Sequence, residues 1–186
     1  MTIDFPNKHF LINGEWVCSD VELDLINPST GDVIGQVSAA GDDHINDAVR
    51  VARDTLENTW NNITARERST ILTKLGRLIE ENIDVLARLE ATDVGKPLKQ
   101  ARADVKALAR YMEFYAGAAD KLHGDTIPYL QDYTVYTLRE PHGVCAHIIP
   151  WNYPMQIIGR SVGAALATGN TCILKPAEEA CLTALA

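Results

Sequence analysis

The sequence predicts an α/β fold, and three observations lead to this prediction. The first forty residues have the short, turn-bounded apolar runs that are typical of strands. Residues 42 to 117 change to apolar spacings of three and four, which indicate amphipathic helices. From residue 144 onward, a strand pattern, a helix pattern and a second strand pattern follow one another, in the order of a β-α-β unit with parallel strands.

The N-terminal strands are predicted from the turns between them. Asn13-Gly14 separates the runs 9–12 and 15–18, and this dipeptide favours the positive φ angles of a tight hairpin turn. The next two strands are expected at 23–26 and 32–37, and the residues between them are of the types that form turns.

The central helices are predicted from their caps and apolar stripes. The first follows the candidate caps Asp42 and Asp43, and Thr64 with Glu67 forms a capping box that opens the second. A third, shorter helix ends at Gly95, a residue that adopts the left-handed conformation of a helix C-cap. The fourth helix is expected at 97–117, with Pro97 in its first turn. We interpret the stripes as core and assign them no chemistry.

The C-terminal part is predicted to be the β-α-β unit. The runs 144–149 and 171–175 are bounded by turn signals and are typical of parallel strands buried on both faces. A helix is expected at 155–168, with a stop at Gly169, and its glycines Gly159 and Gly163 permit close approach to the sheet or to a flat ligand. Residues 133–138, which precede the unit, are predicted to form a further strand.

The last residues resemble an unfinished helix. Residues 178–186 have helical character but carry no glycine cap and no proline stop. A unit of two strands also cannot bury both of its faces alone. We therefore expect the chain to be a truncated part of a larger α/β fold.

Composition and charge narrow the function classes. The net charge of the 186 residues is −8, and no stretch is rich in lysine or arginine, so nucleic acid is not an expected partner. The N-terminal residues 1–10 lack the basic and apolar regions of a secretory signal, and no apolar run is long enough to cross a bilayer. We predict a soluble, cytoplasmic protein without membrane contact.

Cysteine and histidine positions predict no metal site. Cys18, Cys145, Cys172 and Cys181 form no C-x-x-C pair and have no histidine at a metal-ligand spacing. We interpret these cysteines as small core residues, with a reactive thiol as the alternative. His147 is predicted to be a hydrogen-bonded histidine of the core.

The candidate functional residues follow the two predicted parallel strands. Ligands of open α/β sheets bind beyond the carboxyl ends of the strands. The loops 150–154 and 175–180 are therefore the predicted ligand-binding segments. The glycine-rich dinucleotide fingerprint is absent after the first strand. Lys175 and Glu178 have the donor and the acceptor that would hold a ribose diol, and the alternative is a solvated charge pair at a helix start.

Asn152 also has two interpretations. An amide held between Pro150 and Pro154 can donate a hydrogen bond to a developing oxyanion. The alternative is that Asn152 caps the helix that follows. Composition and spacing alone favour the cap.

The motifs as a set resemble those of the NAD(P)-dependent aldehyde dehydrogenase superfamily. The resemblance rests on PHGVCAHIIPWNYPMQIIGRSVGAALATGNTCILKPAEEACLTAL, and on INGEWV, INPSTGDVI and TDVGKPLKQAR upstream of it. It implies a Rossmann-like coenzyme-binding domain formed by residues 1–126 and 143–186, with an oligomerisation strand segment at 127–142. It also implies the oxidation of an aldehyde to an acid through a thiohemiacetal on a cysteine, with hydride transfer to NAD and hydrolysis assisted by a glutamate.

The resemblance assigns roles to the two loops. It implies that Asn152 is the side-chain donor of an oxyanion hole, which reverses the preference for a cap, and that Lys175 and Glu178 clamp a ribose. The coenzyme-binding residues expected from it are Ile148, Ile149, Pro150, Trp151, Asn152, Lys175, Pro176, Ala177 and Glu178. Because the Glu178 carboxylate would repel a 2′-phosphate, NAD is favoured, with NADP as the alternative because Lys175 is near.

Two departures limit what the resemblance implies. Many relatives have a lysine nine residues after the oxyanion asparagine, where this chain has Ser161 after Arg160. The nucleophilic cysteine and the general-base glutamate of the family would lie beyond residue 186, so we expect this chain to be inactive alone. The expected partners are a small aldehyde and, in the full-length protein, further copies of the chain. The alternatives are a non-catalytic nucleotide-binding or interaction module, and an acyl-phosphate or acyl-thioester reductase.

Overall fold

Two antiparallel hairpins form the N-terminal part of the computed structural model, which describes residues 9–186. Strands β1 (Phe10–Ile12) and β2 (Glu15–Val17) pair around Asn13 and Gly14, whose φ angles of 55° and 77° confirm the predicted turn. Strands β3 (Glu22–Ile26) and β4 (Val33–Ser38) form the second hairpin. The predicted range 1–126 begins with residues 1–8, which lie outside the described residues, and the division into domains stays a prediction.

Helices α1 (Asp42–Asn58), α2 (Ala65–Glu81), α3 (Ile83–Val94) and α4 (Leu98–Ala118) occupy the central part of the chain, with a short 3-10 helix, η1 (Trp60–Asn62), after α1. The capping box is confirmed, because the Glu67 N–H donates to Thr64 Oγ1 at 3.2 Å and the Thr64 N–H donates to Glu67 Oε2 at 2.7 Å. Gly95 ends α3 with a φ of 76°. Two predicted caps are shifted by one residue: Gly41, not an aspartate, is the N-cap of α1, and Pro97 is the N-cap of α4.

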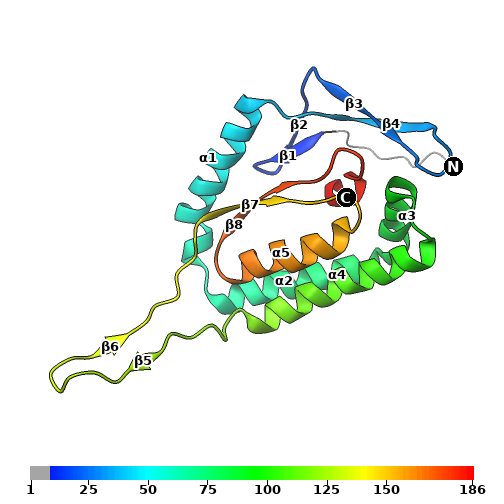
Figure 1. Ribbon diagram of the computed structural model, residues 1–186. Coiled ribbons are helices and arrows are strands. Elements are labelled where there is room, and N and C mark those ends of the chain that lie inside the picture. The colour runs from blue at the N-terminus through cyan, green and yellow to red at the C-terminus, as the bar shows by residue number, and fades with distance from the viewer. Residues whose placement is uncertain (1–8) are drawn as a thin grey trace.

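A long arm projects between α4 and the C-terminal unit (Figure 1). It carries only the two-residue strands β5 (Thr126–Ile127) and β6 (Val135–Tyr136), which pair antiparallel. The strand expected at 133–138 is therefore much shorter than predicted. Its β-branched and aromatic residues favour extended backbone, but a strand needs a partner of matching length, and β5 provides two residues.

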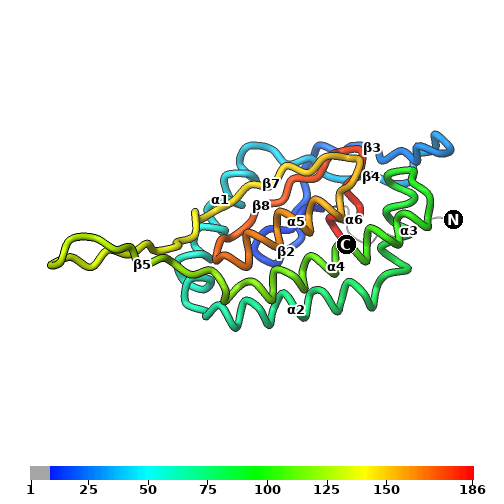
Figure 2. The backbone as a smooth tube through the Cα atoms, turned by 60° about the horizontal axis from the view of Figure 1, so that its bottom comes forward, coloured from blue at the N-terminus to red at the C-terminus, as the bar shows by residue number. Residues whose placement is uncertain are grey.

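The C-terminal residues form the predicted β-α-β unit, which confirms the α/β fold. Strand β7 (Val144–Ile148), helix α5 (Pro154–Ala167) and strand β8 (Thr171–Lys175) follow one another, and β7 pairs in parallel with β8. The small sheet lies between α1 and α5, and α4 and α2 pack beyond α5 (Figures 1 and 2).

Burial of both faces of β7 was predicted, and this prediction is wrong. Ala146 and Ile148 are exposed, Ile148 by 78%. The sheet has two strands in the described part of the chain, and α1 reaches its amino-terminal end, where Thr171 Oγ1 donates to the Ala52 carbonyl at 3.0 Å. Two strands with helices contacting part of each face leave the carboxyl end of β7 accessible to solvent.

Two apolar clusters hold these layers together. The larger joins α2, α3, α4 and α5 around buried residues that include Leu72, Val105, Met112 and Met155. The smaller joins the β3–β4 hairpin to α3 and to the end of the chain; its buried members are Leu25, Val37, Leu89, Cys181 and Leu182. The two clusters share α3, so α3 connects the hairpin to the helical layer.

The predicted helix at 178–186 is shorter than expected. Ala177 and Ala180 form an isolated antiparallel bridge around a turn that contains Glu178, and α6 (Leu182–Leu185) begins only after it. The buried Asp93 carboxylate accepts a hydrogen bond from the Leu182 N–H at 2.8 Å. Because this bond and the burial of Cys181 hold the chain against α3, a continuous helix from residue 178 does not form.

Candidate functional site

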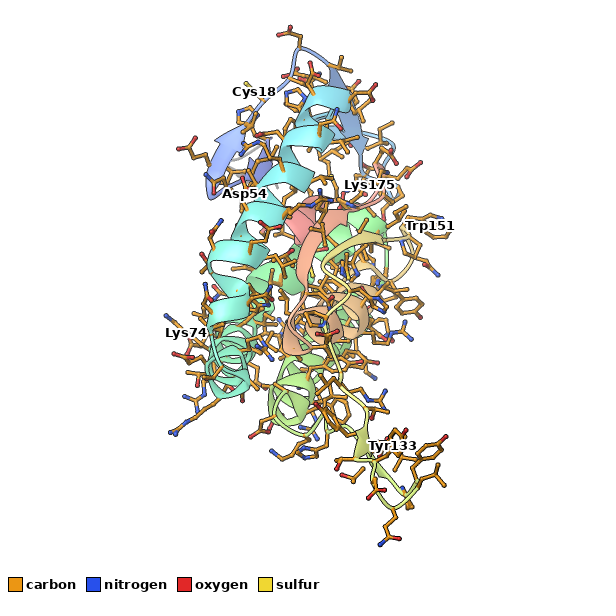
Figure 3. The ribbon with its side chains drawn as sticks, turned by 90° about the vertical axis from the view of Figure 1, so that its left-hand side faces the viewer. Cys18, Asp54, Lys74, Tyr133, Trp151 and Lys175 are labelled. Atoms are coloured by element: carbon orange, nitrogen blue, oxygen red, sulfur yellow. The ribbon has the colours of Figure 1, made fainter. Side chains whose placement is uncertain are left out.

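The carboxyl ends of β7 and β8 lie side by side, as the β-α-β prediction required. Ile148 is the register partner of Lys175, and the Ile149 N–H donates to the Lys175 carbonyl at 2.9 Å. The loops after the two strands therefore start from the same edge of the sheet. Trp151 in the first loop and Lys175 at the start of the second both lie near that edge (Figure 3).

The Asn152 loop presents its polar side chain to solvent. Asn152 is exposed and Trp151 is 61% exposed, whereas Ile149 at the base of the loop is buried. Tyr153, not Asn152, is the N-cap of α5, and Pro154 occupies its first turn. Within residues 9–186 the Asn152 amide has no hydrogen-bond partner, so the cap interpretation is wrong and both amide N–H groups are free to donate.

Lys175 and Glu178 are brought together in the second loop. Lys175 Nζ lies 2.8 Å from Glu178 Oε1, and each side chain is about half exposed. The hydrogen bond from Lys175 lowers the pKa of Glu178, which is ionised at neutral pH. Exposed ion pairs contribute little to stability, so both groups can exchange their mutual contact for hydrogen bonds to a ligand.

The other predicted coenzyme residues have different environments at the same edge. Pro150 is exposed, as is the Ile148 side chain, while Pro176 is half-buried and Ala177 is buried. All nine predicted residues thus lie at the last residue of β7 or β8 or in the loop that follows each strand. Exposed apolar surface beside a free amide and an ion pair is suited to a ligand with both apolar and polar parts.

A cluster of buried charges next to this site was not predicted from the sequence. Lys96 Nζ lies 4.7 Å from the centroid of the Tyr153 ring, a cation–π distance. The same ammonium lies 2.7 Å from Glu90 Oε1 and 2.8 Å from Asp104 Oδ2. Helical periodicity indicates which apolar residues face the core, but it does not indicate that charged residues are buried with them. The apolar stripes of α3 and α4 therefore gave no indication that Glu90 and Asp104 are buried.

The histidine and cysteine residues do not form a second site. His147 Nε2 is buried without a hydrogen-bond partner, so the predicted hydrogen-bonded histidine is wrong, and burial lowers its pKa. Burial raises the pKa of Cys172 and of Cys181 to about 12, which keeps both as neutral thiols. Residues 9–186 contain no group of three or more histidine, cysteine, aspartate or glutamate residues arranged to hold a metal ion. No helix among them has the length and apolarity needed to cross a membrane.

Comparisons with known proteins match nearly the whole chain to one family. A sequence model described as "Aldehyde dehydrogenase family" matches residues 16–186. The mitochondrial aldehyde dehydrogenase family 2 member B4 of Arabidopsis thaliana is 42% identical over 98% of this chain and 35% of that protein. Hydroxyisobutyraldehyde dehydrogenase of Mycolicibacterium austroafricanum is 43% identical over 94% of this chain and 35% of that protein.

Solved structures show the same fold. A mutant of aldehyde dehydrogenase from Bacillus cereus superimposes with a TM-score of 0.93 and 42% identity, over 96% of this chain and 37% of that chain. A mutant of betaine aldehyde dehydrogenase from Staphylococcus aureus, in complex with NAD+, superimposes with a TM-score of 0.92 and 34% identity over 96% of this chain. The chain spans little more than a third of the length of these relatives.

Proposed function

The chain belongs to the aldehyde dehydrogenase family, and we propose that it provides the coenzyme and oxyanion site of an enzyme that oxidises an aldehyde to a carboxylic acid with NAD. The observation that carries this proposal is the pairing of β7 with β8. It brings the free amide of Asn152 and the ion pair of Lys175 and Glu178 to one edge of a parallel sheet. Relatives with NAD or NAD(P) in their names or titles support the choice of coenzyme.

The residues of the second loop fit a nucleotide ribose. A ribose diol needs an acceptor for its hydroxyl protons and a donor to its oxygens, and Glu178 and Lys175 supply one of each, 2.8 Å apart and both accessible. The carboxylate of Glu178 would repel the 2′-phosphate of NADP, which favours NAD. NAD, when bound, supplies the hydride acceptor for the oxidation.

Asn152 is proposed to stabilise negative charge on the substrate oxygen. When a nucleophile adds to an aldehyde carbonyl, the oxygen gains negative charge, and a preoriented N–H donor lowers the energy of that state. The Asn152 amide is available as such a donor, because it is exposed and free of other hydrogen bonds within residues 9–186. This chain has Ser161 at the position where the resemblance led us to expect a lysine. The Ser161 Oγ donates to the Ile157 carbonyl of its own helix at 2.8 Å.

The chain by itself is proposed to bind nucleotide without oxidising aldehydes. Of its cysteines, Cys172 and Cys181 are held as neutral thiols, and Cys145 is the second residue of β7, opposite Cys172 and toward the strand end away from the loops. Cys18 is exposed and lies far from Trp151 and Lys175 (Figure 3). A thiolate is the form that attacks a carbonyl, so Cys172 and Cys181 are poor nucleophiles. The purified chain, incubated with NAD and propanal, should show no increase in NADH absorbance. NADH formation under these conditions would contradict this part of the proposal.

The oxyanion role is tested by grafting. Residues 1–186 replace the matching segment of the Bacillus cereus enzyme, and Asn152→Ala is made in the hybrid. We expect kcat to fall by about 10²- to 10³-fold, the range for losing one oxyanion donor. The control is Asn61→Ala, which truncates an exposed asparagine in the 3-10 helix η1. An unchanged kcat in the Asn152→Ala hybrid would refute the role, and nucleotide binding without any turnover by the hybrid would favour the non-catalytic module.

The strand segment 127–142, which lies in the arm, is proposed to associate with further copies of the chain. It exposes a row of large side chains, of which Tyr129, Leu130, Tyr133 and Tyr136 are each more than 60% exposed. Tyr133 lies near its tip, far from Trp151 and Lys175 (Figure 3). A two-stranded ribbon is marginally stable alone, and pairing with another chain would cover its apolar surface.

Sedimentation velocity tests the association. Leu130→Asp combined with Tyr133→Asp should shift the chain to the monomer, because two charges in an apolar interface are costly to bury. Asp132→Ala, which removes a charge from the exposed tip of the same arm, is the control and should leave association intact. Identical sedimentation of the parent chain and the double variant would reject the arm as the interface.

A further inference from the structure

A buried ion cluster lies behind the two loops of the proposed site. Its members are Lys96 from the α3–α4 connection, Glu90 from α3 and Asp104 from α4. The two carboxylate side chains are fully buried and the Lys96 side chain is 9% exposed. One ammonium therefore bridges two carboxylates inside the protein, and Gln100 Nε2 donates a further hydrogen bond to Asp104 Oδ1 at 2.9 Å.

The cluster contacts the Asn152 loop at Tyr153 and the helix that follows the loop at Gln156. The Lys96 ammonium lies 4.7 Å from the ring centroid of Tyr153, the residue after Asn152. Gln156, in the first turn of α5, donates to Asp104 Oδ1 at 2.7 Å. The loop has few hydrogen bonds of its own: the Ile149 N–H closes its base and the Tyr153 carbonyl accepts from Ile157, so the cluster supplies contacts that the loop backbone lacks.

The same cluster also contacts the chain beyond the Glu178 turn. Thr183 Oγ1 donates to Glu90 Oε2 at 2.9 Å, while Glu90 Oε1 holds Lys96. Next to it on α3, Asp93 accepts from the Leu182 N–H. A continuous path of contacts therefore runs from Tyr153 through Lys96 and Glu90 to Thr183, and it connects the Asn152 loop to α6, the helix that follows the Glu178 turn.

Stability alone does not explain such a cluster. Removing several charges from water costs about as much as their attraction returns, and apolar side chains of the same volume are often as stabilising. What a buried ion bridge adds is a single arrangement of the segments that it connects, because breaking any pair leaves a buried charge without a partner.

We propose that the Lys96–Glu90–Asp104 cluster is a positioning element that holds the loop of Asn152 in a fixed place relative to the turn of Glu178. Lys96 is the positioning residue, because it is the member that contacts the Asn152 loop and both carboxylates. The proposal rests on the proposed function in one respect: the loop that it positions is the one assigned to the oxyanion. The hydrogen bonds from Lys96 outweigh the effect of its burial and raise its pKa, so the ammonium persists at neutral pH.

The test measures the order of the loop in the 186-residue chain. With ¹⁵N-labelled protein, the backbone order parameters of Trp151, Asn152 and Tyr153 are compared between variants. In the parent chain we expect values near 0.85, as in rigid backbone. Tyr153→Leu removes the ring beside the ammonium and should lower the values at Trp151 and Asn152 to below about 0.6. Tyr153→Phe keeps the ring and should restore the parent values.

A second variant acts on the other side of the contact. Lys96→Met alone leaves two buried carboxylates without a counter-charge, which is strongly destabilising, so it is combined with Glu90→Gln and Asp104→Asn. These two substitutions replace the charges with neutral amides whose oxygens still accept hydrogen bonds. This triple variant should keep the parent's midpoint of urea unfolding and should lower the order parameters of Trp151 and Asn152 as Tyr153→Leu does. Phe114→Leu, which removes an exposed ring from α4, is the control.

The outcomes separate positioning from packing. Loss of loop order in Tyr153→Leu and in the triple variant, with Tyr153→Phe unchanged, supports the proposal. Parent-like order parameters in both would overturn it, as would a fall in unfolding free energy without any change in loop order. Hydrogen exchange of the peptide 149–157, measured by mass spectrometry, gives the same comparison if the chain self-associates. Because none of these readouts uses catalysis, the proposed function can fail in the Asn152→Ala hybrid while the positioning result stands.

Discussion

At the scale of single residues, Asn152 shows what local sequence leaves open. An asparagine two residues before a proline is compatible with a helix cap and with an exposed donor, since both uses need only a short amide on a restricted backbone. The structure separates them because the helix begins one residue too late for Asn152 to cap it. Where a helix starts depends on the packing of its first turn, and that is a property of the tertiary structure.

Gly95 gives a prediction at the same scale. Its φ is +76°, and a Cβ placed there would lie 2.6 Å from Cγ of Pro28. Gly95→Ala should therefore lower the free energy of unfolding by about 1 to 3 kcal/mol, through backbone strain and the clash. The measurement is urea unfolding followed by circular dichroism.

Gly117→Ala is the matched control for Gly95→Ala. Gly117 lies in the last turns of α4, where an added Cβ would meet nothing within 4 Å. Alanine is a better helix former than glycine, so stability should stay equal or rise by up to about 1 kcal/mol. Equal effects of the two substitutions would contradict the assignment of Gly95 as a left-handed cap.

At the scale of elements, the glycines of α5 serve a different neighbour from the one expected. They were predicted to permit approach to the sheet or to a ligand, and they face α4 instead. A Cβ on Gly159 would lie 2.8 Å from Tyr111 Cδ2, and one on Gly163 would lie 2.9 Å from Tyr115 Cδ2. A glycine pattern indicates a close contact, but periodicity does not identify the element on the other side of it.

Gly159→Ala tests this helix contact. The new methyl group also meets the Cβ of Tyr111 at 3.0 Å, an atom that cannot move without its helix, so we expect a loss of about 1 to 3 kcal/mol in the free energy of unfolding. Ser161→Ala, on the same helix, removes a hydroxyl that is bonded to its own backbone. That control should change stability by less than about 0.5 kcal/mol. Unchanged stability in Gly159→Ala would show that α4 and α5 are less tightly packed than the structure indicates.

At the scale of the whole molecule, the buried Asp93 makes stability depend on pH. Burial raises its pKa from 3.8 to about 7, although the hydrogen bond from Leu182 opposes the shift. A carboxyl group with a raised folded-state pKa binds more protons when folded than when unfolded. Its contribution to stability is therefore present at low pH and is lost as pH rises from about 4 to about 7.

Asp93→Asn tests this dependence, because an amide keeps an oxygen acceptor for the Leu182 N–H and does not ionise. Between pH 5 and pH 8, the parent should lose roughly 3 kcal/mol of unfolding free energy more than the variant does. Urea unfolding at the two pH values measures both slopes. Asp43→Asn, which removes a carboxylate at the surface, is the control. Parallel pH dependence in the parent and in Asp93→Asn would show that Asp93 does not titrate in this range.

The turns, the caps at Thr64 and Gly95, the order of the elements and the β-α-β unit could be predicted from local sequence. These depend on interactions within a few residues, such as the positive φ of Asn13 and Gly14 or the reciprocal bonds of Thr64 and Glu67, and on the right-handed crossover between parallel strands. The sequence also placed the candidate residues at one edge of the sheet, because consecutive parallel strands share their carboxyl ends.

The support of that edge depends on contacts between distant parts of the chain, which local sequence does not reveal. The contacts of Lys96 with Tyr153, of Glu90 with Thr183 and of Gln156 with Asp104 join residues 52 to 93 positions apart. No period or cap signals a charge that is buried by other elements, because the cost of its burial is met by partners that the fold brings from elsewhere in the chain. The short strands of the arm and the exposed end of β7 were likewise decided by which segments lie beside them.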